Sequence, residues 1–572
     1  MIAREEIRRR VHVPADMAGA NGQPVITGRV NHAIELGRNR IIIVAGLFLL
    51  IFGAIAGRII DLSLPGEVEF VRDGGMHRAL GTIPRAEITD RNGQVIATNL
   101  IVAALELDKR EVPDVAAALE RIANALPGFD RHHAERVISH SGRYAVIAGR
   151  LSPWQQQQIN ELGIPGLRFQ RQLERIYPSK ELFSHVVGYT GDDYRGLSGV
   201  EKSYDDLLAA GEGPLQLSLD LRVQHALHDE LQNSMAYFSA VAASGVVLDV
   251  RNGEVLGLVS LPDFDPNHVQ DPGQKRYFNQ VISGLYELGS TFKIFTTGMT
   301  LDAGLAALDD VYDATDPIRV SRFWIRDYHP ERRPLSVTEI FLHSSNIGSA
   351  KMAMQVGARG QREFLSRLGM FERLPIELPG AMVPPVPQPW GDAKTMTVAY
   401  GHGIAVSPLH LATGVASLVN GGRRVYPTIL QRLADDDGLG ERVISEATSL
   451  NLRRLLRLAV TSKDGTGSRA DVPGYSVGGK TGTANKAAGG RYAKNAKLSS
   501  FVGVFPAEAP RYLVFVVLDE PQGRPETYNF ATGGWTAAPA VGAVISRIAP
   551  ILGVRPRFDD DPLQLAAMRG VE

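Results

Sequence analysis

The sequence predicts an α+β protein that follows a single N-terminal membrane anchor. Three observations lead to this prediction. An uncharged, apolar run lies near the start of the chain, segments typical of β-strands occur at 245–261 and again at 475–518, and the stretch between those two sets is largely helical in pattern. Strands from both ends of one domain, with helices between them, predict an antiparallel sheet flanked by helices.

The bulk composition narrows the functional classes. At 572 residues the chain is too long for one ordinary core, so we expect two or more domains. The 61 basic and 62 acidic residues balance, which argues against a polycationic surface for nucleic acid. The chain has no cysteine, so a disulfide framework, a thiolate metal site and a cysteine nucleophile are excluded.

The predicted anchor spans residues 41–60. Its first part, 41–57, carries no charge, and as a helix it would be roughly 26 Å long, near the lower limit for the hydrocarbon core. Arginines precede the run, at Arg38 and Arg40, and Asp61 follows it. The positive-inside rule then leaves the tail 1–40 in the cytoplasm and the remainder of the chain outside.

A cleaved signal peptide is the alternative for this segment. Ala54-Ile55-Ala56 resembles a cleavage site, and a mature protein beginning at Gly57 would favour cleavage. The forty-residue tail in front of the run and the apolar continuation at Ile59-Ile60 favour an uncleaved anchor instead.

A non-catalytic stalk domain is predicted for residues 61–214. Residues 85–97 are typical of two strands joined at an Asn92-Gly93 turn, and 112–126 and 153–162 have the pattern of amphipathic helices. No catalytic spacing occurs here. His132-His133 has no third ligand nearby, so we expect a surface helix position and not a metal site.

The second predicted domain spans 215–556 and is followed by a flexible tail, 557–572. The Gly/Pro-rich sequence at 211–214 marks its start, and a helix with apolar residues at Val223, Leu227 and Leu231 comes next. The expected strands are 245–250 and 254–261, joined by an Asn252-Gly253 turn, and later 475–485, 498–505 and 512–518.

Ser290-Thr291-Phe292-Lys293 supplies the first chemical motif. Gly289 permits a tight turn into a buried helix, so Ser290 would lie at a helix N-terminus, where unpaired N–H groups favour developing negative charge. Lys293 lies one turn on, on the same face. A serine hydroxyl needs a base, and a lysine serves as one only when burial or a second cation favours its neutral form. Alone the motif is weak, because it arises about once or twice by chance in a chain this long.

Ser344 and Asn346, with one residue between them, form the second motif. In a loop or short helix both can point into one cleft. Ser344 would relay a proton to the leaving amine, and Asn346 would hold the substrate or Lys293 through its amide. Taken alone, the triplet is equally typical of a serine at the start of a helix.

Lys480-Thr481-Gly482-Thr483 is the third motif and lies on a predicted strand. Lys480 is the natural second cation, and Thr481 and Thr483 add two hydroxyls for a substrate carboxylate. Gly482 lets a ligand lie flat against the strand. The backbone N–H groups of Ser290 and Thr483 could form an oxyanion hole. The alternative is an exposed edge strand on which the lysine only prevents aggregation.

These motifs, in this order, are the signature of a serine nucleophile with a lysine base. A hydrolase of this chemistry also needs a carboxylate that aims water at the acyl-enzyme. The stretch from Glu446 to Asn451 has one residue too many for the Glu-x-x-Leu-Asn pattern of class A β-lactamases. We therefore expect a long-lived acyl-enzyme that awaits an amine.

With its motifs in this order, the chain resembles the class B penicillin-binding proteins, and most closely the septal, cell-division peptidoglycan D,D-transpeptidases (FtsI-like). The resemblance runs from the anchor to about Arg555. Besides the three motifs it includes the segments 85–93, 177–191, 249–267 and 400–409. Leu288 and His402 depart from the family pattern, and we expect both at the rim of the cleft.

The resemblance implies a penicillin-binding transpeptidase fold on an elongated stalk, with the catalytic domain in the periplasm at the division septum. It implies D-Ala-D-Ala stem peptides as substrates and β-lactams bound covalently at Ser290. It also implies partners in the membrane: a division-type glycosyltransferase and divisome regulators. No metal or organic cofactor is expected.

Alternatives remain at this point. The chain could be an elongation-type transpeptidase, although the asparagine of Ser344-x-Asn346 resembles the division branch. It could be a D,D-carboxypeptidase or a β-lactam hydrolase. Finally, it could be a divisome scaffold whose acyl site is dispensable, although three intact motifs argue against that.

Overall fold

The computed structural model describes residues 46, 48–53, 84–191, 193–320, 323–433, 436–488 and 491–558. Residues 46 and 48–53 are helical and belong to a first compact unit, 1–77; the second unit is 78–572. No helix within the described residues is both long enough and apolar enough to span a membrane. Most of the predicted anchor, the tail 1–40 and nearly all of the tail 557–572 lie outside the described residues.

The second unit begins with a small sheet, whose strands come from the predicted stalk and, in β5, from the two residues just after its predicted end at 214. Its strand order is β3-β2-β1-β5, with β4 paired to β2. The strands are β1 (Ile88–Thr89), β2 (Val95–Asp108), β3 (Tyr144–Leu151), β4 (Leu167–Ile176) and β5 (Leu215–Gln216). The predicted strand, turn and strand at 85–97 are confirmed. Gly93 takes a positive φ of 78° at the turn, and the Asp90 carboxylate accepts from the N–H groups of Asn92 and Gln94, both at 2.8 Å.

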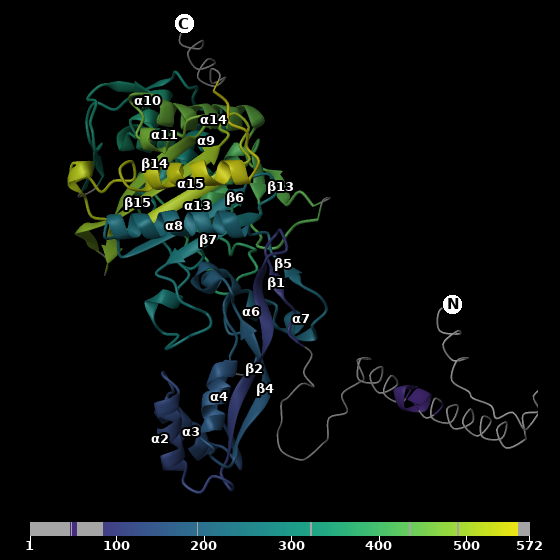
Figure 1. The fold of residues 1–572 in the computed structure, drawn as a ribbon. Coiled ribbons are helices and arrows are strands. Elements are labelled where there is room, and N and C mark those ends of the chain that lie inside the picture. Colours follow the sequence, from purple (N-terminus) through teal and green to yellow (C-terminus); the bar gives the residue numbers. More distant parts are fainter. Residues whose placement is uncertain are drawn as a thin grey trace, which may run out of the picture. The chain divides into compact units, whose positions relative to one another are not determined.

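Seven short helices within the described residues belong to this region, and α2, α3 and α4 lie beside β2 and β4 (Figure 1). They are α2 (Val115–Ala125), α3 (Arg131–His140), α4 (Pro153–Glu161), η3 (Lys180–Phe183), α5 (Ser184–Val187), α6 (Gly199–Ser203) and α7 (Asp205–Ala210). The helices predicted at 112–126 and 153–162 are thus confirmed. Leu119 and Ile122 of α2 pack in a small core with Leu105 and Ile147 of the strands. His132 lies on α3 with its side chain 87% exposed, as predicted for a surface position.

A buried ionic cluster links the strands of the stalk to α6. The carboxylate of Glu201, on α6, accepts from Arg85 Nε at 2.6 Å and from Arg175 Nε at 2.7 Å. All three side chains are nearly inaccessible to solvent. Arg85 also pairs with Asp205 at 2.7 Å. Two arginines are therefore held inside the stalk by carboxylates.

The centre of the larger domain is a five-stranded sheet in the order β14-β15-β16-β6-β7, with every neighbouring pair antiparallel. The strands are β6 (Ala242–Asp249), β7 (Val255–Leu261), β14 (Gly478–Ala488), β15 (Arg491–Phe505) and β16 (Tyr512–Asp519). The predicted antiparallel sheet with strands from both ends of the domain is confirmed.

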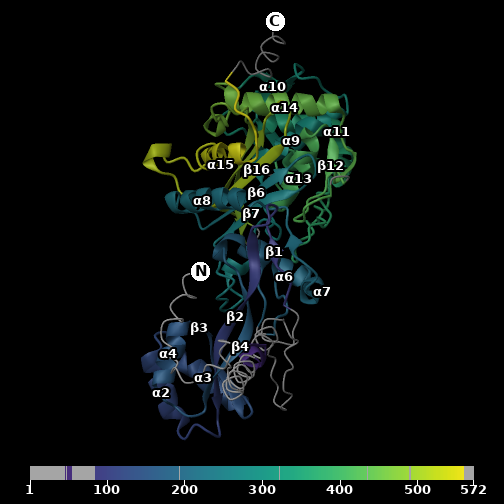
Figure 2. The same ribbon diagram turned by 45° about the vertical axis from the view of Figure 1, so that its right-hand side comes forward.

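Helices cover both faces of this sheet. Figure 2 shows α8 (Leu221–Tyr237) and α15 (Ala537–Ile551) on one side, and α9 (Lys293–Asp302), α11 (Asn346–Arg367) and α13 (Pro408–Val419) on the other. Leu227 of α8 and Val541 of α15 share one core with the sheet, whereas Phe295 and Val415 belong to the core of the opposite face. Each face buries its own apolar cluster, as expected for a layered α+β domain.

The remaining elements are short, apart from one long helix. They are β8 (Val311–Asp313), β9 (Ile318–Val320), β10 (Phe323–Ile325), β11 (Pro334–Ser336), β12 (Arg423–Val425), β13 (Leu439–Arg442), α10 (Val337–Leu342), α12 (Asp392–Val398), α14 (Glu446–Thr461), η4 (Lys275–Tyr277), η5 (Gly289–Phe292), η6 (Ser468–Ala470) and η7 (Pro525–Thr527). The hairpin of β9 and β10 and the helix α10 precede the second motif along the chain.

Candidate active site

Ser290 lies in the 3₁₀ turn η5, which runs directly into α9. Lys293 is the first residue of α9, and its Nζ donates to Ser290 Oγ at 3.1 Å. Ile294, Phe295 and Met299 are buried, so the helix is central, as predicted. The expected pairing of the serine and the lysine one turn on is therefore present.

Ser344 joins this pair from the turn between α10 and α11. Its backbone has a positive φ of 59°, a conformation that non-glycine residues rarely adopt. Its Oγ accepts from Lys293 Nζ and from Lys480 Nζ, each at 3.0 Å, and Lys293 Nζ also donates to its carbonyl oxygen. One hydroxyl group thus bridges the two lysines.

Lys480 reaches Ser344 from β14, the edge strand of the large sheet. It pairs with Val502 of β15 and is fully buried, with its Nζ 5.8 Å from the centre of the Phe341 ring. The alternative of an exposed lysine that only protects a sheet edge is therefore wrong. The edge of β14 is covered by η5, and the lysine points into the domain instead of into solvent.

Burial controls the charge of both lysines. Desolvation, followed by the nearby charge of Lys480, lowers the pKa of Lys293 well below its ordinary value, whereas the carboxylate of Asp327 raises it. Desolvation lowers the pKa of Lys480 to about 7. Within the described part of the chain neither lysine forms an ion pair with a carboxylate. The site therefore favours a neutral amine beside Ser290.

The other residues of the third motif make contacts of their own. Thr481 Oγ1 lies 2.8 Å from Thr466 Oγ1, and Thr483 Oγ1 accepts from the N–H of Gly533 at 3.0 Å. Gly482 leaves no room for a side chain, because a methyl group there would lie 2.3 Å from Ser500 Oγ. The strand thus presents hydroxyls next to a bare backbone position.

Backbone atoms lie closest to Gly289, the residue that precedes Ser290. Gly289 has a φ of 57°, and a methyl group on it would lie 2.6 Å from the carbonyl oxygen of Thr483. A methyl group on Gly401 would lie 2.2 Å from the carbonyl oxygen of Gly289. In an extended strand the N–H and C=O of one residue point to the same side, so the N–H of Thr483 also faces η5.

Asn346 is held apart from the lysines. Its Nδ2 donates to the carbonyl oxygen of Arg326 at 2.8 Å, and its backbone N–H donates to Asp327 at 2.5 Å. The structure therefore brings Ser290, Lys293, Ser344 and Lys480 into one hydrogen-bonded group and places Asn346 at its border.

Asp327 is a site residue that the sequence did not reveal. Its carboxylate accepts from Ser345 Oγ at 2.7 Å and from the N–H groups of Asn346 and Ile347 at the start of α11. A carboxylate at a helix N-terminus is favourable because unpaired N–H groups meet it there. Asp327 thereby fixes the turn that carries Ser344.

Of the two residues expected at the rim of the cleft, Leu288 does not lie there and His402 still can. Leu288 is buried in the core of the domain and does not line a rim. His402 is half-buried, its ring centre lies 5.1 Å from that of Tyr400, and burial lowers its pKa. Only His402 therefore remains a candidate for the edge of the cleft.

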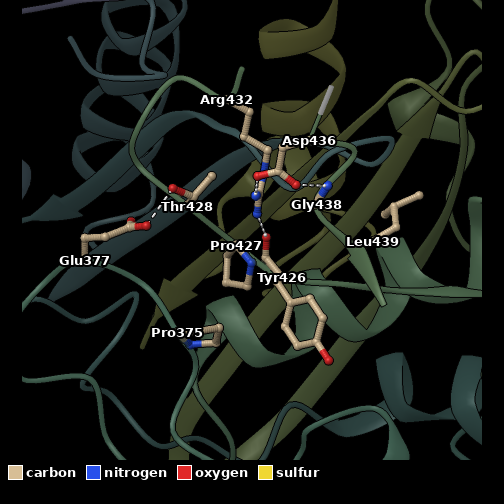
Figure 3. A pocket seen from close by; sticks show the side chains of 9 residues that line it. All are labelled: Pro375, Glu377, Tyr426, Pro427, Thr428, Arg432, Asp436, Gly438 and Leu439. Carbon is tan, nitrogen blue, oxygen red and sulfur yellow. Dashed lines mark hydrogen bonds and ion pairs between the residues drawn. The ribbon is translucent and has the colours of Figure 1, made fainter. Parts of the chain in front are cut away.

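A separate cavity of about 420 Å³ does not belong to this site (Figure 3). Its polar groups already satisfy one another: Glu377 accepts from Thr428 at 2.7 Å, and Arg432 donates to Asp436 and to the carbonyl of Tyr426. None of the predicted site residues lines it. Its lining is Pro375, Glu377, Tyr426, Pro427, Thr428, Arg432, Asp436, Gly438 and Leu439.

Comparisons with known proteins agree with this geometry. Residues 243–545 match the family model of the penicillin-binding protein transpeptidase domain, and residues 82–224 match that of the penicillin-binding protein dimerisation domain. The chain is 39% identical, over 82% of each chain, to a probable peptidoglycan D,D-transpeptidase FtsI of Caulobacter vibrioides. It is 29% identical, over 90% of this chain and 92% of the relative, to the peptidoglycan D,D-transpeptidase FtsI of Escherichia coli K12.

A solved structure shows the same arrangement. The crystal structure of penicillin-binding protein 3 of Mycobacterium tuberculosis, complexed with aztreonam, superposes with a TM-score of 0.66 at 25% identity. The likeness covers 84% of this chain and 98% of that one. The α+β domain described above therefore has the penicillin-binding transpeptidase fold.

Proposed function

The chain belongs to the class B penicillin-binding proteins of the cell-division type, and on that premise we propose how it works as a peptidoglycan D,D-transpeptidase. It cross-links stem peptides at the division septum through a serine acyl-enzyme. The observation that carries the mechanism is the 3.1 Å contact between Lys293 Nζ and Ser290 Oγ, in a site where the lysine has a lowered pKa. A neutral amine at hydrogen-bond distance is what a serine nucleophile requires.

In the first half-reaction, neutral Lys293 takes the proton of Ser290 Oγ as the oxygen attacks the carbonyl carbon of the penultimate D-alanine. The amide C–N bond breaks, and the leaving D-alanine nitrogen receives a proton through the hydroxyl of Ser344, which contacts both lysines at 3.0 Å. The peptidyl group is then an ester of Ser290. The N–H groups of Ser290 and Thr483 stabilise the oxyanion.

The second half-reaction transfers the peptidyl group to an amine of another stem peptide and restores the serine. Within the described residues, no carboxylate hydrogen-bonds Ser290, Lys293, Ser344 or Lys480, so no acidic side chain is positioned there to activate water. This arrangement favours transfer to an amine over hydrolysis.

The substrate carboxylate is assigned to Lys480, Thr481 and Thr483, with Gly482 leaving room for the substrate backbone. Asn346 borders the site and is assigned to the substrate amide through its remaining Oδ1. β-Lactams take the place of the D-Ala-D-Ala end and acylate Ser290.

The placement of the enzyme in the cell follows from the same premise. We assign 41–60 to a single membrane anchor, 1–40 to a cytoplasmic tail, 61–214 to the stalk and 215–556 to a periplasmic transpeptidase domain, with a flexible tail at 557–572. The partners are a division-type membrane glycosyltransferase and divisome regulators. Their association with the septum is tested by imaging the tagged chain in dividing cells.

Labelling with fluorescent penicillin tests the enzymatic proposal. The full chain in detergent is labelled, digested and mapped by mass spectrometry, and the label is expected on the peptide that contains Ser290. Ser290→Ala should abolish labelling without changing the unfolding temperature. A label on any other residue, or no label on folded protein, would contradict the assignment.

A further inference from the structure

Within the described residues, one face of the hairpin of β9 and β10 carries exposed side chains. On the other face Val320 and Ile325 are buried, at 5% and 2% exposure, whereas Phe323 is 47% exposed. Trp324 lies on the opposite face with 51% of its surface exposed. Arg319 is its direct cross-strand partner and is also exposed. One face of the hairpin therefore presents an aromatic ring and a cation side by side to solvent.

Cationic groups surround this tryptophan. The guanidinium carbon of Arg326 lies 5.6 Å from the centre of the Trp324 ring, within the range of a cation–π contact. Neither Arg319 nor Arg326 forms an ion pair with an acidic group in the described ranges. Tyr328, 66% exposed, lies two residues further along the chain, after Asp327. We call Arg319, Trp324, Arg326 and Tyr328 the arginine–tryptophan face.

The arginine–tryptophan face adjoins the candidate active site directly. The carbonyl oxygen of Arg326 accepts from Asn346 Nδ2 at 2.8 Å, and the next residue, Asp327, accepts from Ser345 and Asn346. Only the end of a stem peptide contacts the reacting groups, so the rest of a polymeric substrate has to leave the cleft across its border. On the Asn346 side, that border is the segment that continues from this face.

We propose that the arginine–tryptophan face binds the glycan strand of the peptidoglycan substrate together with the carboxylates of its stem peptides, outside the catalytic cleft. The inference rests on the proposed function and extends it to the substrate beyond the reacting amide. The apolar face of a hexose ring fits against an exposed indole, and two arginines without acidic partners complement an anionic polymer. Within the described residues, neither Trp324 nor Arg319 hydrogen-bonds Ser290, Lys293, Ser344 or Lys480, so we expect acylation by a β-lactam not to depend on this face.

The experiment compares three variants of the full chain in detergent with the wild type: Trp324→Ala, Arg319→Ser and, as the matched control, Trp154→Ala. Trp154 is another exposed tryptophan, at 59%, on α4 of the stalk. The probes are fluorescent penicillin and soluble, uncross-linked glycan strands that carry pentapeptide stems. Unfolding temperatures verify that each variant is folded, and Arg319→Ser keeps the proposal testable if Trp324→Ala is unstable.

We expect Trp324→Ala to raise the Kd for glycan strands and the KM of cross-linking by roughly fivefold to tenfold. A change of this size is expected because the variant loses about one exposed aromatic contact with the substrate. Arg319→Ser should weaken binding less and reduce its salt dependence. The rate of penicillin acylation should stay within about twofold of wild type in all variants, and Trp154→Ala should bind glycan normally.

Different failures have different meanings. If the wild type does not react with penicillin, the proposed function itself fails. If penicillin reacts normally and Trp324→Ala binds glycan strands as well as wild type does, the inference is overturned. The inference is also overturned if Trp324→Ala loses as much affinity for free stem peptides without sugars as it does for glycan strands. It is overturned, too, if the variants bind glycan strands normally but fail to support cell division, because that result would indicate a protein partner.

Discussion

The stalk and the active site each bury two cations, but they treat the charges in opposite ways. In the stalk, Arg85 and Arg175 share the carboxylate of Glu201, with contacts of 2.6 and 2.7 Å. In the active site, Lys293 and Lys480 share only the neutral hydroxyl of Ser344. Burial of a charge is costly unless an opposite charge compensates it. The stalk contains a carboxylate that balances the buried charges, whereas the described residues of the active site place none in contact with the two lysines.

The use of arginine in the stalk and of lysine in the active site agrees with this difference. An arginine keeps its proton in proteins, so its charge has to be balanced where it is buried. A lysine can release its proton, and the lowered pKa values of Lys293 and Lys480 show this response. The comparison teaches that the missing carboxylate is what converts an ordinary ammonium group into a base.

Placing a permanent cation in the active site should have the largest effect. In Lys293→Arg the side chain stays charged, so it cannot accept the proton of Ser290. We expect the second-order rate of penicillin acylation at neutral pH to fall by about 10²- to 10⁴-fold, the usual contribution of a general base. A variant that folds normally yet keeps more than a tenth of the wild-type rate would show that another group is the base.

Removing the compensation in the stalk should affect stability instead of chemistry. In Glu201→Gln both arginines lose their shared charge, and we expect the free energy of unfolding to fall by about 3–5 kcal/mol. Denaturant titration measures this fall. Asp193→Asn is the control, because its contact with Arg195 is 3.7 Å long and exposed, and we expect a change within about 1 kcal/mol. Acylation per folded molecule should not change; a loss of acylation in folded Glu201→Gln would mean that the two regions are coupled.

The smallest expected effect comes from removing the negative charge of Asp327, which partly counteracts the lowering of the Lys293 pKa. Asp327 favours the protonated form of Lys293, and Lys480 opposes it; His402 is also within range of the Lys293 charge. In Asp327→Asn the pKa of Lys293 falls further, so neutral lysine persists to lower pH. The acidic limb of the acylation rate plotted against pH should then move to lower pH.

The same variant should also lower the plateau of that profile by about tenfold, because a charge-assisted hydrogen bond to the Ser344 turn is lost. Asp313→Asn, a change at an exposed acid on β8, is the control and should move neither quantity. If the maximal acylation rate falls but the pH at which the rate declines does not move, Asp327 has only a structural role.

Much of the active site could be predicted because its residues stand in short, ordered motifs. Ser290 and Lys293 meet through helix geometry, and Lys480 follows from the pattern of its strand. Asp327 could not be predicted, because it contacts Ser345 across 18 residues of chain that include β11 and α10, and no short motif links the two positions. The hairpin of β9 and β10 was missed for a related reason: strands of three residues are too short to show a period of two.

The three bare backbone positions next to the nucleophile, Gly289, Gly401 and Gly482, have a consequence for drug resistance. Any side chain at these positions would lie within 2.6 Å of a neighbouring atom. Gly289, Gly401 and Gly482 therefore cannot accept a larger residue unless the backbone around Ser290 moves. Substitutions that weaken an inhibitor are therefore expected at neighbouring side chains instead of at these three glycines.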